Sequence, residues 1–101
     1  MLKTELNTCD NTTTVVLEGK LDANTAAELK ERLDEIPDEV SGLNLDIEKL
    51  AYTSSAGLRL IIQYNNLMKQ RGGKLTILHP NELISELFKD TGLLKHLNVI
   101  N

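Results

Sequence analysis

Residues 43–70 change from a strand pattern to a helix pattern without an intervening loop. Every second residue from Leu43 to Ile47 is apolar, as expected of a strand with one buried face. After residues 52–59, apolar side chains recur at helical spacing as far as about residue 70. A strand that leads directly into an amphipathic helix needs a sheet on which that helix can pack. This segment therefore predicts the α/β class.

The turn at residues 52–59 carries two adjacent hydroxyls, Ser54 and Ser55. Serine is favoured where a helix begins because its side-chain oxygen accepts a hydrogen bond from a first-turn N–H group. Ala56 and Gly57 are small, so we expect that another molecule can approach this turn closely. The free N–H groups and the positive end of the helix dipole favour an anion, including a phosphate carried by the serine itself. The sequence thus predicts a turn suited to negative charge.

The rest of the chain continues the alternation of strands and helices. The expected elements are a hairpin of strands at about 2–8 and 13–19, a helix at 25–36, a strand at 74–78, a helix at 81–89, and a short helical turn or final strand within 93–100. This order predicts an α/β sandwich with a mixed sheet of four to five strands and helices mainly on one face.

Local patterns also predict how two of these helices begin and which face they bury. Thr25 and Glu28 fit a capping box for the first helix, with Asn24 as a competing cap. In the helix at 81–89 four apolar residues are expected to face the core: Leu83, Ile84, Leu87 and Phe88.

Size and charge exclude several classes of function. The chain has 101 residues and a formal net charge of −4, without a Lys/Arg cluster, so we expect one small domain that does not bind nucleic acid. No apolar run is long enough for a membrane span, and the N-terminus lacks the apolar block of a signal peptide. A lone Cys9 agrees with a reducing compartment. We therefore predict a cytoplasmic protein with no membrane association.

Three short segments, in order along the chain, resemble one known family: Gly19-Lys20-Leu21-Asp22, Ser54-Ser55-Ala56-Gly57-Leu58, and Leu87-Phe88 with Thr91-Gly92-Leu93. They are similar to motifs of STAS domains, and within that family to those of bacterial anti-sigma factor antagonists. The resemblance covers nearly the whole chain and implies a single domain, residues 1–101, with the STAS-type sandwich. Ser54 departs from the family pattern, which usually has Asp at this position.

The resemblance also implies a function. Members bind an anti-sigma factor that is also a serine kinase, and this binding frees a sigma factor; phosphorylation of the antagonist ends the binding, and a serine phosphatase reverses the mark. Ser55 lies where the family's phosphorylated serine lies, and Ser54 is the less favoured site. The residues expected to contact the partner are Asp22, Thr53, Ser54, Ser55, Ala56, Gly57 and Arg59. The alternative is a STAS subunit that is not phosphorylated and binds another partner or a small ligand.

Arg59 follows Ser55 at the i, i+4 spacing that brings helical side chains together. The favoured interpretation is an arginine on a solvated helix face, and the alternative hypothesis is that its guanidinium pairs with a phosphate on Ser55.

Catalysis by the chain itself is not expected. A serine nucleophile needs a nearby base, and Thr53 stands where a Gly-x-Ser-x-Gly nucleophile turn has its first glycine. His79 and His96 are far apart in sequence and do not form a metal-ligand pattern with the single cysteine. Gly72 and Gly73 mark a turn, without the further residues of a phosphate-binding loop. We therefore predict no enzyme activity, no metal and no cofactor.

Overall fold

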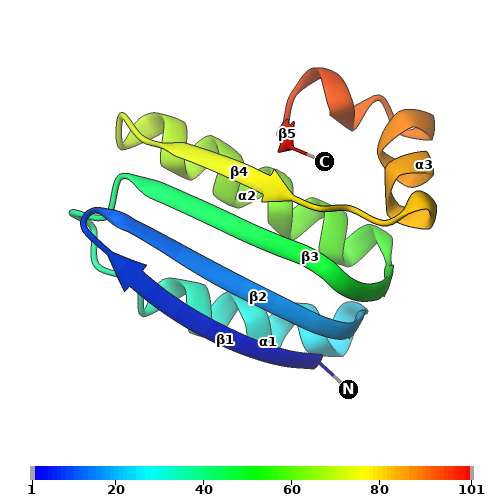
Figure 1. Ribbon diagram of the computed structural model, residues 1–101, viewed down its shortest axis with the longest axis horizontal. Helices are drawn as coiled ribbons and strands as arrows, with labels where there is room; N and C mark the ends of the chain where they lie inside the picture. The colour runs from blue at the N-terminus through cyan, green and yellow to red at the C-terminus, as the bar shows by residue number, and fades with distance from the viewer. Residues whose placement is uncertain (1, 101) are drawn as a thin grey trace.

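The computed structural model describes residues 2–100 as five strands, three α-helices and one short 3₁₀ helix (Figure 1). In chain order the elements are β1 (Leu2–Cys9), β2 (Thr12–Leu21), α1 (Ala23–Asp34), β3 (Gly42–Thr53), α2 (Ser55–Gln70), β4 (Lys74–Leu78), α3 (Glu82–Asp90), η1 (Leu93–Lys95) and β5 (Asn98–Ile100). The predicted hairpin is present, and the C-terminal segment contains both of the alternatives considered for it.

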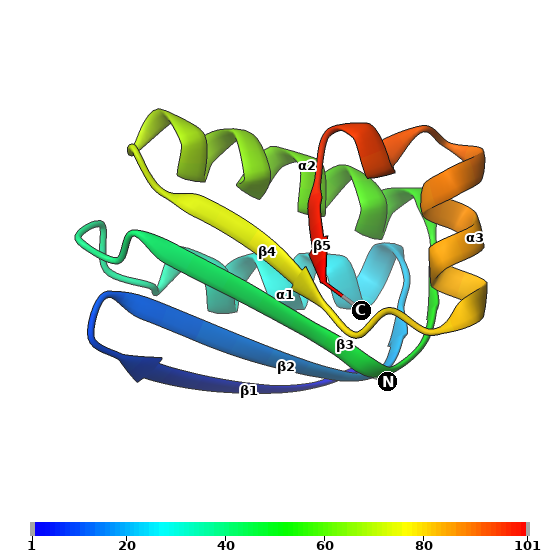
Figure 2. The ribbon, with the colours of Figure 1, turned by 45° about the horizontal axis from the view of Figure 1, so that its top comes forward.

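The sheet has the strand order β1-β2-β3-β4-β5. β1 is antiparallel to β2, and every later neighbour is parallel. Helices α1 and α2 lie side by side on one face of the sheet, while α3 lies near one end (Figures 1 and 2). The predicted class, a mixed sheet with helices mainly on one face, is confirmed. Because the strand order never reverses, this sheet lacks the crevice in which doubly wound α/β proteins bind nucleotides.

The core is aliphatic and lies between the sheet and its two covering helices. The alternating residues of β2 and β3 point into it, and α2 contributes its predicted apolar face. Its largest fully buried side chain is Phe88 of α3, which closes one end. Beside this core, the Ser54 N–H donates to the Leu21 carbonyl at 2.8 Å and so ties the β3–α2 turn to β2.

The first helix begins two residues earlier than predicted. Its N-cap is Asp22, whose carboxylate accepts from the backbone N–H groups of Asn24 and Thr25 at 3.0 and 2.9 Å. The Thr25 hydroxyl oxygen in turn accepts from the Asp22 N–H at 2.8 Å. The capping box thus joins Asp22 and Thr25, and the predicted box of Thr25 with Glu28, as well as the cap at Asn24, is wrong. The helix starts here because β2 ends at Leu21, where the Leu21 carbonyl accepts from Ser54 N–H at 2.8 Å.

One residue of α3 does not face the core as predicted. Ile84 and Phe88 are fully buried and Leu87 is partly buried, but Leu83 is 53% exposed. Asn81 caps this helix and donates through its side-chain Nδ2 to the Leu50 carbonyl at 2.7 Å. This bond fixes how α3 docks, and the docked helix turns Ile84 inward and Leu83 outward.

A hydroxyl–carboxylate contact joins the two covering helices. Tyr64 of α2 is buried and donates its hydroxyl to Asp34 of α1. Lys30 contacts the same carboxylate at 2.8 Å and, together with Tyr64, lowers the pKa of Asp34. Burial, followed by the bond to Asp34, raises the pKa of Tyr64. The contact therefore favours the protonated phenol and the ionised carboxylate.

Replacing Tyr64 by phenylalanine is expected to destabilise the protein by about 1 kcal/mol at pH 7, less than is usual for a hydrogen bond to a charged group, because Asp34 is exposed. The pKa of Asp34 is depressed in the folded state, so its stabilising effect is present above the unfolded value of 3.8 and is lost as the pH falls through the lower folded-state pKa. Urea unfolding of Tyr64→Phe and wild type should thus differ at pH 7 and converge at a pH low enough to protonate Asp34 in the folded protein. An equal difference at both pH values would show that lost packing, and not the hydrogen bond, is the cause.

Candidate functional site

Three helices begin near the same end of the sheet. α1, α2 and α3 follow the parallel strands β2, β3 and β4, and their N-caps are Asp22, Ser54 and Asn81 (Figure 1). The Ser54 N–H donates to the Leu21 carbonyl, and Asn81 donates to Leu50 near the end of β3. The polarised first turns of the helices, each bearing free N–H groups, thus surround the β3–α2 turn, which favours a negatively charged group there.

Ser54 uses its side chain to start α2. Its hydroxyl oxygen accepts from Gly57 N–H at 3.4 Å, and its carbonyl accepts from Leu58 N–H at 3.0 Å. The residue is half-buried and in the extended conformation typical of an N-cap. Serine and aspartate are both good N-cap residues, so Ser54 can start the helix although the family motif that this turn resembles has Asp at this position.

Ser55 is the first residue of α2 and is exposed. The two serines therefore differ in their surroundings: the Ser54 hydroxyl is directed back at the helix, whereas Ser55 is open to solvent. A phosphate on Ser55 would lie beside the first-turn N–H groups. Accessibility therefore favours Ser55 over Ser54 as the hydroxyl that a second protein can reach.

Gly57 has a packing role that differs from the expectation. It is buried, and a Cβ added at this position would lie 2.7 Å from Leu21 Cγ and still closer to Thr53 Oγ1. Thr53 is itself 3% exposed, and its hydroxyl donates to the Ser54 carbonyl at 3.3 Å. The small residue thus lets α2 approach the sheet, while access for another molecule depends on the exposed Ser55 and the partly buried Ala56. The burial of Thr53 and Gly57 gives no support to direct contact with a partner.

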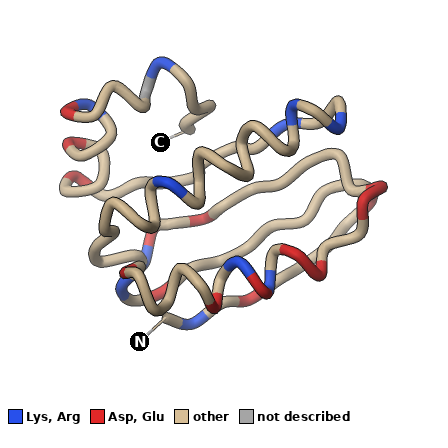
Figure 3. The backbone as a smooth tube through the Cα atoms, turned by 180° about the vertical axis from the view of Figure 1, so that it is seen from behind, with Lys and Arg blue, Asp and Glu red and all other residues tan. Residues whose placement is uncertain are grey.

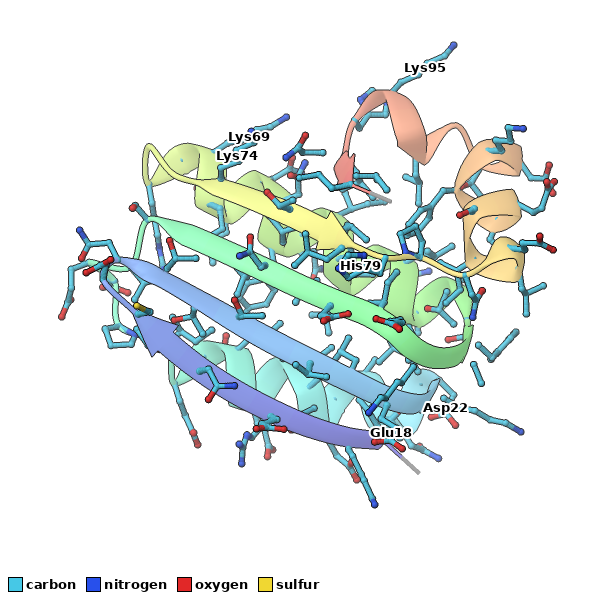
Figure 4. All side chains as sticks on the ribbon, in the orientation of Figure 1. Glu18, Asp22, Lys69, Lys74, His79 and Lys95 are labelled. Atoms are coloured by element: carbon cyan, nitrogen blue, oxygen red, sulfur yellow. The ribbon has the colours of Figure 1, made fainter. Side chains whose placement is uncertain are left out.

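Asp22 and Arg59 flank the turn. Hydrogen bonds, chiefly from the Thr25 N–H, lower the pKa of Asp22, so the capping carboxylate is ionised. Figure 4 shows Asp22 near Glu18 at the same end of the molecule. Arg59 is exposed one turn after Ser55 and is one of two charged residues in α2, the other being Lys69 near its far end (Figure 3). A phosphate on Ser55 would thus have a cation within one helical turn.

Residues 2–100 show neither a metal-binding cluster nor a membrane-spanning helix. No three His, Cys, Asp or Glu side chains of this part of the chain are grouped to hold a metal ion. No helix within it is long and apolar enough to cross a membrane. His79 lies in the β4–α3 connection, two residues before the Asn81 cap, and is exposed.

Two residues of this region have roles that differ from those predicted from the sequence. Asn81 was expected to be the first residue of a helix, but it is the cap that ties α3 to β3. The apolar spacing of Leu50 and Tyr52 predicts that both side chains face inward, but Tyr52 is 44% exposed. An asparagine just before an apolar helical repeat is a recognisable cap signal. The outward orientation of Tyr52 could not be foreseen, because it depends on register shifts between β2 and β3.

Known proteins are similar to this chain in sequence. The anti-sigma-B factor antagonist of Staphylococcus aureus (strain NCTC 8325 / PS 47) is 33% identical over 100 residues, which are 96% of this chain and 93% of that protein. The antagonist of the same name from Bacillus subtilis (strain 168) is 27% identical over 84 residues, covering 83% of this chain and 77% of that protein.

Solved structures show the same fold. A putative anti-sigma factor antagonist from Thermotoga maritima superposes with a TM-score of 0.90 at 15% identity, covering 97% of this chain and 86% of that chain. The anti-sigma factor antagonist SpoIIAA in its unphosphorylated form gives 0.78 at 16% identity, covering 98% and 88%. SpoIIAA in the phosphorylated form gives 0.77 at 18% identity, covering 98% and 92%. The STAS domain model matches residues 3–101, and with the curated relatives this shows that the chain belongs to the STAS domain family.

Proposed function

We propose that this protein is an anti-sigma factor antagonist that acts by binding, not by catalysis. It binds an anti-sigma factor that is also a serine kinase, and thereby frees a sigma factor in the cytoplasm. Phosphorylation of Ser55 ends the binding, and a serine phosphatase restores it. One observation about the β3–α2 turn carries this proposal: the Ser54 hydroxyl caps the helix, whereas Ser55 is exposed at the first helical position.

The turn is suited to carry the phosphate without unfolding. The added charge of about −1.5 to −2 lies at a helix N-terminus, where free N–H groups and the dipole stabilise it. Ser55 is exposed, so the phosphate can remain hydrated and displaces no buried side chain. The match of this fold to both the unphosphorylated and the phosphorylated form of SpoIIAA supports a mark that leaves the domain intact.

Release of the partner follows from the chemistry of the transfer. A kinase must bring the terminal phosphate of ATP next to the Ser55 hydroxyl, so the product phosphoserine lies beside the phosphates of the remaining ADP. The phosphoserine and the ADP phosphates are both negatively charged and repel each other, and an interface screens this repulsion less than bulk water does. The transfer therefore weakens the complex in which it took place.

Ser54 supports one alternative function. In place of the family's usual Asp it removes a carboxylate from the position next to the acceptor hydroxyl. If the kinase requires that carboxylate, the chain is instead a STAS subunit that binds another partner or a small ligand without being phosphorylated.

Phosphopeptide mapping tests the proposal. Wild type, Ser55→Ala and Ser54→Ala would be recovered from their own cells with any bound proteins. We expect phosphate on Ser55 in wild type and in Ser54→Ala, none in Ser55→Ala, and an ATP-binding kinase retained mainly by unphosphorylated protein. Phosphate on Ser54 would preserve the mechanism and change the site. Absence of phosphate from both serines, with no kinase bound, would favour the alternative subunit.

Replacing Arg59 by alanine is expected to raise the pKa of the Ser55 phosphate by roughly 0.4 units, since an exposed ion pair contributes about 0.5 kcal/mol. The titration can be followed by ³¹P NMR on phosphorylated protein. Lys69→Ala is the matched control, because it removes the other charge of α2 far from Ser55. If Arg59→Ala shifts the phosphate pKa no more than Lys69→Ala does, Arg59 is only a solvated residue.

A further inference from the structure

Exposed large apolar side chains are few in the described part of the chain. They are Tyr52, Leu83 and Ile100, which are 44%, 53% and 52% exposed. Tyr52 and Leu83 both lie at the end of the sheet where the three helices begin, whereas Ile100 lies in the edge strand β5. Two of the three thus belong to the region around Ser55.

The fold holds Tyr52 and Leu83 at one corner. Tyr52 pairs with Lys20 in the β2–β3 register and precedes Ser55 by three residues. The hydrogen bond from Asn81 to the Leu50 carbonyl joins α3 to β3 at 2.7 Å. Tyr52 is two residues from Leu50, and Leu83 is two residues from Asn81, so each Cα lies at most about 7 Å from the Cα of the residue that makes this bond. Both positions are set by backbone elements and not by a loose loop.

Both side chains lie at the surface although their neighbours in the chain are buried. β3 buries Leu50 and Thr53 on either side of Tyr52, and α3 buries Ile84 next to Leu83. Large apolar groups left outside the core lose the gain of burial until another surface covers them. Tyrosine is also enriched among the residues that contribute most to protein interfaces, because its ring buries a large area with little loss of conformational freedom.

We propose that Tyr52 and Leu83 are the apolar anchors on which the anti-sigma factor docks when Ser55 enters its kinase site. This inference rests on the proposed function. A typical interface covers about 800 Å² per partner, a patch roughly 30 Å across, so a kinase centred on Ser55 also covers a residue three positions away. The anchors provide affinity that does not depend on charge, whereas the charged groups Asp22 and Arg59 belong to the starts of α1 and α2 at the same end of the sheet. Phosphorylation then adds charge repulsion to the complex, while the apolar attraction of Tyr52 and Leu83 stays the same.

The test compares Tyr52→Ser, Leu83→Ser and the double variant with wild type in binding to the purified anti-sigma factor of the same organism. ADP is present, so that no phosphate is transferred, and calorimetry gives the affinity. Ile100→Ser is the matched control: Ile100 is as exposed as Leu83 and lies at the level of Asp46, six residues before Tyr52 on β3 and roughly 20 Å away along the strand. Thermal melts and gel filtration establish folding and oligomeric state.

We expect each anchor variant to bind at least tenfold more weakly than wild type, with Ile100→Ser within twofold and all melting temperatures unchanged. In kinase assays the anchor variants should show a raised KM and an unchanged kcat, because the anchors do not touch the transferred phosphate. Wild-type affinity in both anchor variants would overturn this inference and leave the proposed function standing. The same holds if Ile100→Ser loses as much affinity for the partner as the anchor variants do. It also holds if the anchor variants bind the partner normally but no longer self-associate. Failure of wild type to bind would overturn the proposed function and the inference together.

Discussion

Phosphorylation of Ser55 is expected to weaken binding to the anti-sigma factor about a hundredfold. A phosphoserine beside the phosphates of ADP places like charges near one another, and one pair of unit charges 6 Å apart at an effective dielectric constant of 20 costs roughly 3 kcal/mol. A loss of 2.8 kcal/mol corresponds to a hundredfold in affinity. Protein phosphorylated by the kinase and separated by anion exchange can be compared with unphosphorylated protein by calorimetry.

Two controls separate this effect from unfolding and from loss of the hydroxyl. Thermal melts of the phosphorylated protein should match those of wild type, because the charge lies at a helix N-terminus. Ser55→Ala should bind within about threefold of unphosphorylated wild type and should accept no phosphate, since it lacks only a small exposed group. A phosphorylated protein that binds as tightly as the unphosphorylated one would contradict the switch.

Replacing Gly57 by alanine is expected to destabilise the protein by about 2 kcal/mol, although alanine is the better helix former. The new Cβ would lie 2.7 Å from Leu21 Cγ and even closer to Thr53 Oγ1, and both residues are buried. The first turn of α2 must therefore move away from the sheet. Urea unfolding measures the loss, and the displaced turn should also lower the rate at which Ser55 is phosphorylated.

Two further variants establish the cause of this loss. Ala27→Gly, at an exposed position of α1, measures the ordinary effect of helix propensity in this protein. This variant should be less stable than wild type by about 1 kcal/mol. Gly57→Ala combined with Thr53→Ala removes the atom nearest the new Cβ and should cost less than the two separate changes together. A stabilising Gly57→Ala would mean that the glycine is not needed for packing.

Much of the fold could be predicted because its signals are local. Alternation in β3 and the helical repeat in α2 gave the correct element types, and α2 spans Ser55–Gln70 as expected. The errors occurred where local signals compete. Asp22, Asn24 and Thr25 are all residues that cap helices, and the choice among them was decided by where β2 ends against Ser54.

The same distinction applies to the candidate site. The residue types of the turn predict that it tolerates negative charge, and the resemblance to the family motifs predicts Ser55 as the serine that is phosphorylated. The orientation of Leu83 could not be predicted, because four apolar residues in one short helix leave two orientations open until the Asn81–Leu50 bond fixes the docking. Tyr52 likewise has the apolar spacing of an inward residue relative to Leu50, and the register shift beside β2 between these two residues turns it outward.

The sequence by itself thus determined the alternation of strands and helices, the capping character of the turn and the family to which its motifs are similar. These properties depend on residues close together in the chain, where periodicity and backbone preference act. The tertiary structure alone decided that Gly57 is needed for packing, that Ser54 is committed to the cap while Ser55 is exposed, and that Tyr52 and Leu83 share one corner. The physical reason is that burial and exposure depend on contacts between residues far apart in the chain, and neither can be determined from one segment alone.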